Sequence, residues 1–288
     1  MTHTDLLKSN IQAHMRPKKR LGQHFLVKDS IIQEIIGRSG FGASDLIVEI
    51  GPGLGALTLP LARSVKQIIA VEKDSNLVDL LKKKLVRTGI QNVTVVNHDI
   101  LKWDFHQAKP FHSSRLHVIG NLPYNISSPL LKKLVENKMF IDRAVLMLQE
   151  EVARRLTASP CEKAYGALTL LIRYHAHTVT LLEVPKEAFY PKPKINSAVV
   201  ELDFEQQYPD ISVREKDFSK VVKGAFAHRR KTILNSLKGS NASFDRATLL
   251  YAMKKCTIDP KRRAETLHMD EFLRLASVLS LTKARGKC

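Results

Sequence analysis

The feature that most constrains the fold is an alternation of short β-branched apolar runs with amphipathic helical stretches between residues 46 and 158. Strands that follow one another with helices between them form a parallel sheet, because a crossover helix returns the chain to the same end of the sheet. The predicted strands are 46–50, 68–71, 93–97, 116–120 and 143–148. The pattern predicts an α/β fold with a doubly wound, Rossmann-like sheet.

Helical spacing fills the gaps between these strands. The predicted helices are 57–63, 76–88, 129–137 and 150–158, followed by another at 166–174. Ser127 or Ser128 is expected to cap the third helix, with Pro129 in its first turn. Two β-rich runs, 178–184 and 197–204, are expected to form a closing hairpin, and the prolines between them predict an extended loop at 189–194.

The character of the chain changes after residue 204. Residues 206–210 are typical of a linker, and the helical runs that follow are 215–227, 231–237, 246–254 and 270–279. We therefore expect two domains: an α/β domain over 1–208 with a basic N-terminal arm, and a small basic helical domain over 209–288.

Positive charge gathers at the two ends of the chain. The sequence holds 46 Lys and Arg against 28 Asp and Glu; residues 1–28 carry +5, residues 209–288 carry +10, and the 180 residues between them only +3. Such asymmetry favours a polyphosphate partner, because Lys and Arg release the counterions condensed on nucleic acid. General solubility is the alternative explanation.

Several protein classes are disfavoured. The longest uncharged stretch, 116–131, is interrupted by two prolines, so no regular transmembrane helix is expected. The three cysteines show neither paired nor metal-ligand spacing, and the N-terminus lacks an apolar leader. His175 and His177 lie two positions apart but have no third ligand nearby in the sequence, so we expect no metal site. We further expect a monomeric cytoplasmic protein.

A glycine-rich turn follows the first predicted strand. Residues 51–55 read Gly-Pro-Gly-Leu-Gly, and glycines let the backbone approach a ligand before a helix begins. Gly51 and Gly53 are thus candidates for cofactor binding, although an ordinary tight turn would show the same pattern.

Two carboxylates strengthen the cofactor interpretation. Glu72 ends the second strand, 21 residues after Gly51, where an acid accepts the ribose hydroxyls of a nucleoside. Asp99 follows the third strand and could accept a hydrogen bond from an adenine amino group. The glycine spacing is shorter than in a dinucleotide-binding motif, with no nearby basic residue for a phosphate, so the hypothesis is S-adenosylmethionine.

The fourth strand leads into Asn121-Leu122-Pro123-Tyr124. The Asn121 side-chain oxygen and the Leu122 carbonyl could accept both N–H groups of an adenine N6, which localises the nitrogen lone pair and stabilises the cation formed on attack. Tyr124 could stack on the purine, although a plain turn with a packed tyrosine is the alternative.

The chain resembles the KsgA/Dim1 family of small-subunit ribosomal RNA adenine dimethyltransferases, most closely its bacterial branch. The matching stretches are 21–26, 49–58, 71–74, 98–99, 121–127, 189–193 and 197–199. The resemblance implies that His24 and Leu26 cover the amino-acid end of S-adenosylmethionine with Gly51 beneath it, and that Glu72 binds ribose and Asp99 adenine. It also implies that Asn121 contacts both cofactor and target. Many relatives have Asn where this chain has His24.

The resemblance further implies dimethylation of two adjacent adenosines near the 3′ end of 16S ribosomal RNA during small-subunit assembly. Two alternatives stay open: an erythromycin-resistance type enzyme acting on large-subunit RNA, and a non-catalytic RNA-binding assembly or transcription factor. Phe189 could close the other face of the target base or pack in the core. Arg16, Lys18, Lys19 and Arg20, and the Arg229-Arg230-Lys231 cluster, are candidates for RNA phosphates, whereas Lys82-Lys83-Lys84 is interpreted as a solvated helix face.

Overall fold

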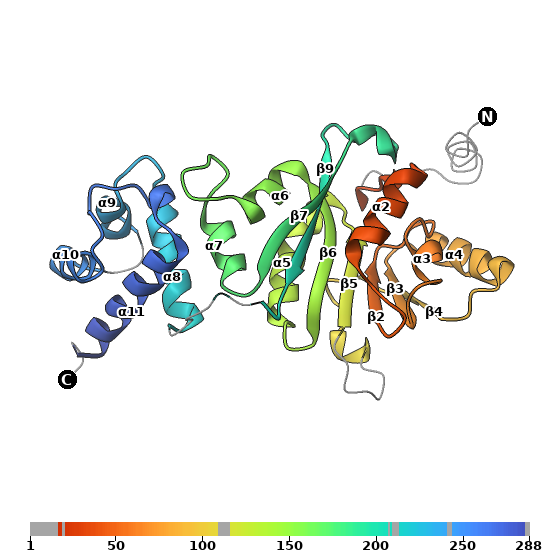
Figure 1. Cartoon of the computed structure of the whole chain (residues 1–288), viewed down its shortest axis with the longest axis horizontal. Coiled ribbons are helices and arrows are strands. Elements are labelled where there is room, and N and C mark those ends of the chain that lie inside the picture. Colours follow the sequence, from red (N-terminus) through yellow and green to blue (C-terminus); the bar gives the residue numbers. More distant parts are fainter. Residues whose placement is uncertain are drawn as a thin grey trace. The chain divides into compact units, whose positions relative to one another are not determined.

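A seven-stranded sheet dominates the described part of the computed structural model, which comprises residues 17–18, 21–108, 116–206, 208, 213–240 and 244–285 (Figure 1). The strand order is β4-β3-β2-β5-β6-β9-β7; β2 to β6 are parallel, and β9 is antiparallel to both β6 and β7. The strands are β2 (Leu46–Ile50), β3 (Gln67–Glu72), β4 (Val93–Asn97), β5 (Leu116–Asn121), β6 (Ile141–Gln149), β7 (His177–Val184) and β9 (Ser197–Asp203). The predicted doubly wound α/β class and closing hairpin are confirmed.

The strand order reverses at β2, which has β3 and β4 on one side and β5 and β6 on the other. In such sheets a ligand crevice opens at the carboxyl ends of the strands, where the chain leaves in opposite directions. Gly120 permits the close pairing of β5 with β2, because a Cβ on it would lie 2.8 Å from the Ile50 carbonyl oxygen. The crevice therefore lies between residues that follow Ile50 and residues that follow Gly120.

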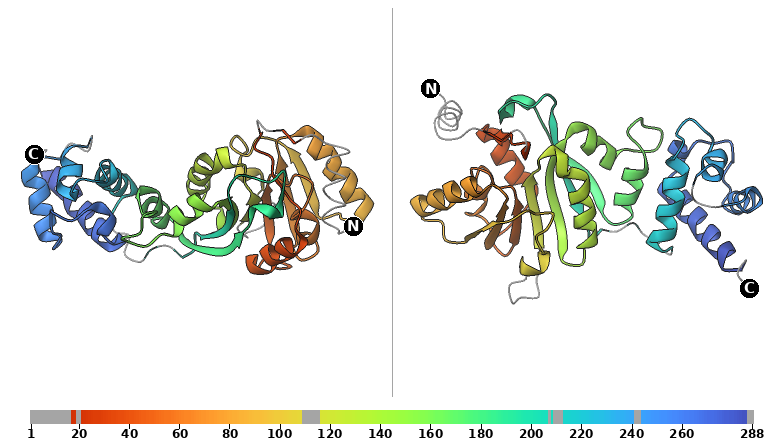
Figure 2. Two further views of the ribbon diagram at one scale, coloured as in Figure 1. Left: turned by 90° about the horizontal axis from the view of Figure 1, so that it is seen from above. Right: turned by 180° about the vertical axis from the view of Figure 1, so that it is seen from behind.

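The helices that alternate with these strands along the chain are α2 (Asp29–Ser39), α3 (Thr58–Leu61), α4 (Ser75–Thr88), α5 (Ser127–Glu136) and α6 (Glu150–Thr157), with 3₁₀ turns η2 (Phe105–Ala108), η3 (Tyr124–Ile126) and η4 (Lys186–Ala188). Helix α4 packs on β3 and β4 and lies at that edge of the sheet (Figures 1 and 2). Its buried row of Leu77, Leu81 and Leu85 follows the helical period that predicted it.

The structure adds elements that the sequence interpretation lacked. Helix α2 buries Ile31, Ile32 and Ile35, and ends at Gly40, whose φ of 62° is the left-handed conformation of a helix C-cap. Strands β1 (Phe25–Leu26) and β8 (Phe189–Tyr190) pair antiparallel, so the extended loop predicted at 189–194 begins as a strand. The expected serine cap of α5 is wrong: α5 starts at Ser127 without a side-chain cap, and Ser127 Oγ donates instead to the Tyr124 carbonyl.

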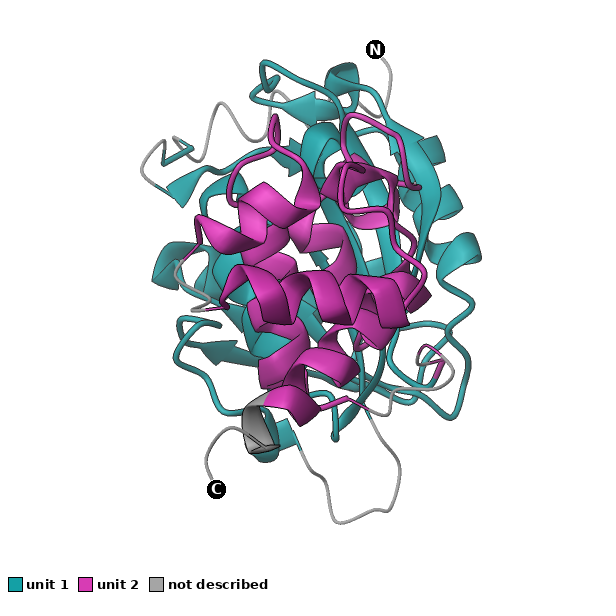
Figure 3. Cartoon of the chain, turned by 90° about the vertical axis from the view of Figure 1, so that its left-hand side faces the viewer, with its two compact units in different colours: residues 1–153, 177–205 teal, residues 154–176, 206–288 magenta. Residues whose placement is uncertain are grey.

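The chain forms two compact units, residues 1–153 with 177–205, and residues 154–176 with 206–288 (Figure 3). The second unit contains the second half of α6, α7 (Ala167–Arg173), α8 (Glu215–Phe226), α9 (Ile233–Lys238), α10 (Arg246–Lys255), α11 (Met269–Arg285) and η5 (Ala264–Thr266). Its core takes in Tyr165 and Tyr174, whose hydroxyls donate to the carbonyls of Leu267 and Val213. Residues 154–176 thus group with the helices, whereas the sequence interpretation assigned them to the first domain.

Candidate functional site

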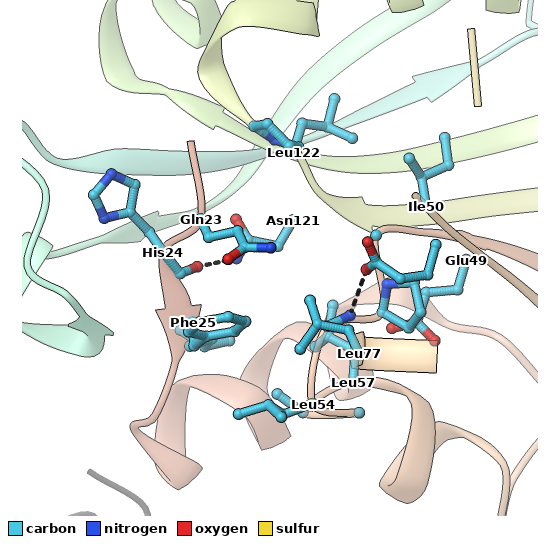
Figure 4. A pocket seen from close by; sticks show the side chains of 18 of the residues that line it. Gln23, His24, Phe25, Glu49, Ile50, Leu54, Leu57, Leu77, Asn121 and Leu122 are labelled. Carbon is cyan, nitrogen blue, oxygen red and sulfur yellow. Dashed lines mark hydrogen bonds between the residues drawn. The ribbon is translucent and has the colours of Figure 1, made fainter. Parts of the chain in front are cut away.

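A cavity of about 880 Å³ occupies the crevice at the carboxyl ends of β2, β3 and β5 in the first unit (Figure 4). This volume is at the upper end of the roughly 300–1,000 Å³ typical of small-molecule sites. Of the residues predicted for the site, the cavity is lined by His24, Leu26, Gly51, Gly53, Glu72, Asp99, Asn121, Leu122 and Tyr124. The fold therefore brings together side chains that are far apart in sequence.

Two glycines of the turn, Gly53 and Gly55, leave little room for a side chain. Gly53 has a φ of 56°, and a Cβ on it would lie 3.3 Å from the Phe25 ring. At Gly55, with a φ of 79°, a Cβ would lie 2.8 Å from Leu81 Cδ1. Only glycine combines these left-handed angles with such close neighbours, so the backbone itself forms the floor of the cavity.

Glu72 ends β3 as a buried carboxylate, 7% exposed. Its Oε2 accepts a hydrogen bond of 3.2 Å from the Gly53 amide, and its Oε1 one of 2.8 Å from the Asp74 amide. Burial raises the pKa of Glu72 above its ordinary value. Two backbone donors thus fix this carboxylate beside the glycine turn, in a position suited to polar hydroxyls.

Asp99 stands at the next strand end. Its Oδ2 accepts 2.8 Å from Lys73 Nζ, and its Oδ1 accepts 3.0 Å from the Leu101 amide. Burial acts to raise the pKa of Asp99, but the hydrogen bond from Lys73 and that from Leu101 outweigh it and hold the pKa below its ordinary value. Asp99 is therefore an anionic acceptor at the cavity wall.

Glu49 is a cavity residue that the sequence interpretation missed. It is 2% exposed within β2, and burial raises its pKa from 4.5 to about 7. Its Oε2 is buried and makes no hydrogen bond to any described residue. Thr58, whose Oγ1 is likewise buried without a partner among the described residues, acts on the pKa of Glu49 in the opposite direction to burial. An unpaired buried carboxyl oxygen is costly in a folded protein, which makes Glu49 a candidate to accept a hydrogen bond from a ligand. The signal in the sequence was an acid inside an otherwise apolar strand.

Asn121 ends β5 beside the crevice. Its Nδ2 donates 2.9 Å to the His24 carbonyl (Figure 4), which leaves Oδ1 as the free acceptor of the carboxamide. Neither this Oδ1 nor the Leu122 carbonyl oxygen accepts a hydrogen bond from another described residue, and the Leu122 amide is bound to the Met147 carbonyl at 3.1 Å. Two acceptors are therefore available at one strand end.

Tyr124 is held on both its ring and its hydroxyl. The ring is stacked with His24 at 5.6 Å between centroids and 26° between planes, and the hydroxyl lies 3.0 Å from Ser197 Oγ. Burial raises the pKa of Tyr124, so its hydroxyl stays protonated. His24 in turn has its Nδ1 2.7 Å from the Pro191 carbonyl oxygen.

Basic side chains reach the cavity, contrary to the interpretation of the glycine turn as lacking them. Lys84 Nζ donates 3.1 Å to the Leu54 carbonyl, and Lys83, Arg87 and Arg63 also line the wall. Lys83 and Lys84 are therefore more than the solvated face expected from the lysine run. Arg63 lies eight positions after Gly55 and was overlooked, whereas α4 supplies Lys83, Lys84 and Arg87 from about thirty positions away, beyond the sequence window around the glycines.

Other expected site residues lie elsewhere. Phe189 is 2% exposed and belongs to a hydrophobic core cluster, and it does not line the cavity. Arg229, Arg230 and Lys231 belong to the second unit, where Arg229 Nη2 donates to the carbonyls of Lys163 and Tyr165. Lys18 is described and pairs with Asp74. The RNA-phosphate candidates Arg16, Lys19 and Arg20 lie outside the described residues.

Across the described ranges, no group of three or more His, Cys, Asp or Glu is arranged to hold a metal ion. None of the described helices has the length and apolar character needed to cross a membrane.

The family model for ribosomal RNA adenine dimethylase matches residues 14–281. A ribosomal RNA small subunit methyltransferase A from Desulforapulum autotrophicum is 41% identical over 279 residues, 97% of each chain. The protein of the same name from Bacillus cereus is 39% identical over 272 residues, 92% of each chain.

Solved structures show the same fold. A dimethyladenosine transferase from Plasmodium falciparum superposes with a TM-score of 0.76 and 26% identity, covering 90% of this chain and 98% of that one. The 23S rRNA methyltransferase ErmE superposes with a TM-score of 0.71 and 24% identity, covering 89% and 99%. The ErmE likeness extends to the fold alone.

Proposed function

The chain belongs to the ribosomal RNA adenine dimethylase family, and on that basis we propose that it transfers methyl groups from S-adenosylmethionine to N6 of two adjacent adenosines near the 3′ end of 16S ribosomal RNA. The observation that carries this proposal is the pair of acceptors at the end of β5, Asn121 Oδ1 and the Leu122 carbonyl, together with the buried Glu72 and the partly buried Asp99 of the same cavity.

The cavity residues suit the cofactor. The glycine turn forms a floor that a Cβ would fill, Glu72 is an acceptor for ribose hydroxyls, and Asp99 is an acceptor for an adenine amino group. The buried Oε2 of Glu49 has no hydrogen-bond donor among the described residues and would accept a hydrogen bond from a cationic or hydroxyl-bearing ligand. When bound, S-adenosylmethionine supplies an electrophilic methyl group. His24, Leu26, Gly51 and Gly53 complete the wall that we assign to it.

The chain's own contribution to chemistry is placement and electrostatics. Adenine N6 is a weak nucleophile because its lone pair is delocalised into the ring. Acceptors on both N–H groups favour a tetrahedral nitrogen, and they stabilise the positive charge that develops there. Tyr124 would hold the purine by stacking, a contact worth about 1–3 kcal/mol per base. The methylated nitrogen becomes acidic and releases its proton to water, so alignment is the main source of rate.

The two alternative functions have less support. Relatives named for the small subunit cover nearly the whole chain at about two-fifths identity, whereas ErmE is similar in fold only. A non-catalytic assembly or transcription factor would not need an oriented Asn121 with two open acceptors.

The substrate form and setting extend the same proposal. We infer that the partner is 16S RNA in the small subunit or its precursor, that the protein acts as a monomer in the cytoplasm, and that residues 209–288 form a basic RNA-binding domain. The charge of +10 on those residues supports the last inference.

The test incubates the protein with isotopically labelled cofactor and small subunits that lack the modification, then maps the labelled nucleotides. Label confined to two adjacent adenosines near the 3′ end of 16S RNA is the expected result. Label on large-subunit RNA under matched conditions would support the erythromycin-resistance type, and no label on either would contradict the proposed reaction.

A further inference from the structure

One wall of the cavity is formed by an N-terminal segment of the chain that we call the strap, which comprises Pro17, Lys18 and residues 21–27. Residues 21–27 all line the cavity. The strap is anchored at one end, where Phe25 and Leu26 pair with β8 and the Val27 amide donates 2.9 Å to the Ala188 carbonyl. At the other end, the described residues Pro17, Lys18 and 21–24 belong to no strand, and side-chain contacts hold this end to the first unit.

Asp74 provides that second anchor. Its Oδ1 lies 2.7 Å from Lys18 Nζ, and its Oδ2 accepts 3.0 Å from Gln23 Nε2. Gln23 Oε1 in turn accepts 2.7 Å from the Lys18 amide, which closes a ring of three residues. The Asp74 side chain is only 2% exposed, against 35% for Lys18, so the ion pair is shielded on its acidic side.

The charge state of Asp74 matches this arrangement. Burial acts to raise its pKa, but the hydrogen bonds from Lys18 and Gln23 outweigh burial and hold the pKa below its ordinary value. Asp74 also caps α4 by accepting 3.2 Å from the Asn76 amide. The carboxylate therefore ties the strap to the rigid start of a long helix.

Asp74 is connected to both halves of the cavity. Its amide donates 2.8 Å to Glu72 Oε1, the acid assigned to the ribose. Through Gln23 it also holds the neighbouring His24, whose carbonyl accepts the Asn121 Nδ2 at 2.9 Å. A continuous set of hydrogen bonds and one peptide link thus joins Glu72 to Asn121.

We propose that Asp74 is a positioning residue for methyl transfer: by holding the strap through Lys18 and Gln23, it fixes the His24 carbonyl that orients the Asn121 carboxamide. A carboxamide presents an oxygen on one side and an NH₂ on the other. With the His24 carbonyl in place, Nδ2 is occupied and Oδ1 is turned to the reacting amine. If the strap shifts, the amide can turn its NH₂ toward the substrate N–H, and the acceptor is lost.

The proposal rests on the proposed function, and its test separates the two. Asp74→Asn keeps the size of the side chain and a good helix cap but removes the charge that pairs with Lys18. At saturating cofactor and RNA, we expect kcat to fall about tenfold to a hundredfold, because small misplacements of reacting groups cost rates of this order. A purely structural role in the cavity wall would raise KM for cofactor and leave the saturated kcat unchanged.

A second variant guards against misfolding of the first. Lys18→Met combined with Gln23→Leu leaves Asp74 and the helix cap intact, and we expect the same fall in kcat. The conservative variant Lys18→Arg keeps the charge that pairs with Asp74, so its kcat should stay near that of the wild type. Glu187→Gln removes the exposed ion pair with Lys192, which lies outside the strap, and serves as the matched control. A saturated kcat within twofold of wild type in the Lys18/Gln23 variant would overturn the proposal. Absence of methyl transfer by the wild type would instead overturn the proposed function.

Discussion

The Nδ2 of Asn121 donates a hydrogen bond of 2.9 Å to the backbone carbonyl of His24, across 97 positions of the sequence. This contact assigns the two ends of the carboxamide to different tasks. The nitrogen makes a hydrogen bond within the protein, and the oxygen is available to accept a hydrogen bond from a ligand.

Asn121→Ala is expected to lower the rate of methyl transfer by about a hundredfold to a thousandfold, the usual effect of removing one group that stabilises transition-state charge. Cofactor affinity should stay near that of the wild type, because the glycine turn, Glu72 and Asp99 are untouched. Single-turnover kinetics and calorimetric titration of the cofactor measure the two quantities. Retained activity would remove Asn121 from the mechanism.

Tyr124→Ala is expected to weaken placement of the target base by about 1–3 kcal/mol, the contribution of one aromatic stack. Tyr124→Phe keeps the ring and loses only the contact between the hydroxyl and Ser197 Oγ, so it should act as the near-normal control. The comparison is made on kcat/KM for small subunits. Equal losses in both variants would show that the hydroxyl, and not stacking, is what matters.

Glu72→Gln is expected to weaken cofactor binding at least tenfold. The carboxylate accepts from the amides of Gly53 and Asp74, and a glutamine would have to point its NH₂ at one of these donors. Leaving a buried donor unsatisfied costs about 1–3 kcal/mol. Calorimetric titration provides the dissociation constant, and an unchanged value would refute the assigned role of Glu72.

Glu49→Gln should change how stability depends on pH. The pKa of Glu49 is about 7 in the folded protein and 4.5 in the unfolded chain, so the folded state binds this proton more tightly. The protonated Glu49 carboxyl therefore contributes its full stabilisation below pH 4.5. This contribution to the free energy of unfolding, about 3 kcal/mol, is lost as the pH rises to about 7. Urea unfolding measures the free energy of unfolding at pH 5 and at pH 8, and the decrease between the two should be smaller in the variant than in the wild type. An equal decrease in both proteins would contradict the prediction.

Arg230→Ala with Lys231→Ala should weaken binding to small subunits and lower the slope of log affinity against log salt by about 1.5, as expected for two lost phosphate contacts. Both side chains are exposed in the second unit. Lys66→Ala, at the amino end of β3, is the control with an expected unchanged slope. An unchanged slope in the double variant would exclude this cluster from RNA binding.

The local pattern of apolar and β-branched residues predicted most strands of the seven-stranded sheet. The strands 46–50 and 93–97 were predicted with their observed bounds, because β-branched residues in short runs leave few other conformations open. Helix α2 escaped prediction although Ile31, Ile32 and Ile35 have helical spacing, and β1 and β8 escaped because a two-residue strand has no periodicity. Such short strands exist only through their pairing with a distant segment.

The side chains that we propose act on a ligand could be predicted from the sequence, since Glu72, Asp99 and Asn121 stand at strand ends and parallel strands end at one edge. The sequence therefore determined which strand ends line the cavity. Only the tertiary structure decided how those groups are held: Glu49 without a donor, Lys84 against the glycine turn, and Asp74 joined to Lys18 and Gln23. These contacts depend on distances between segments 30 to 56 positions apart, and backbone propensity and hydrophobic period act over only a few residues.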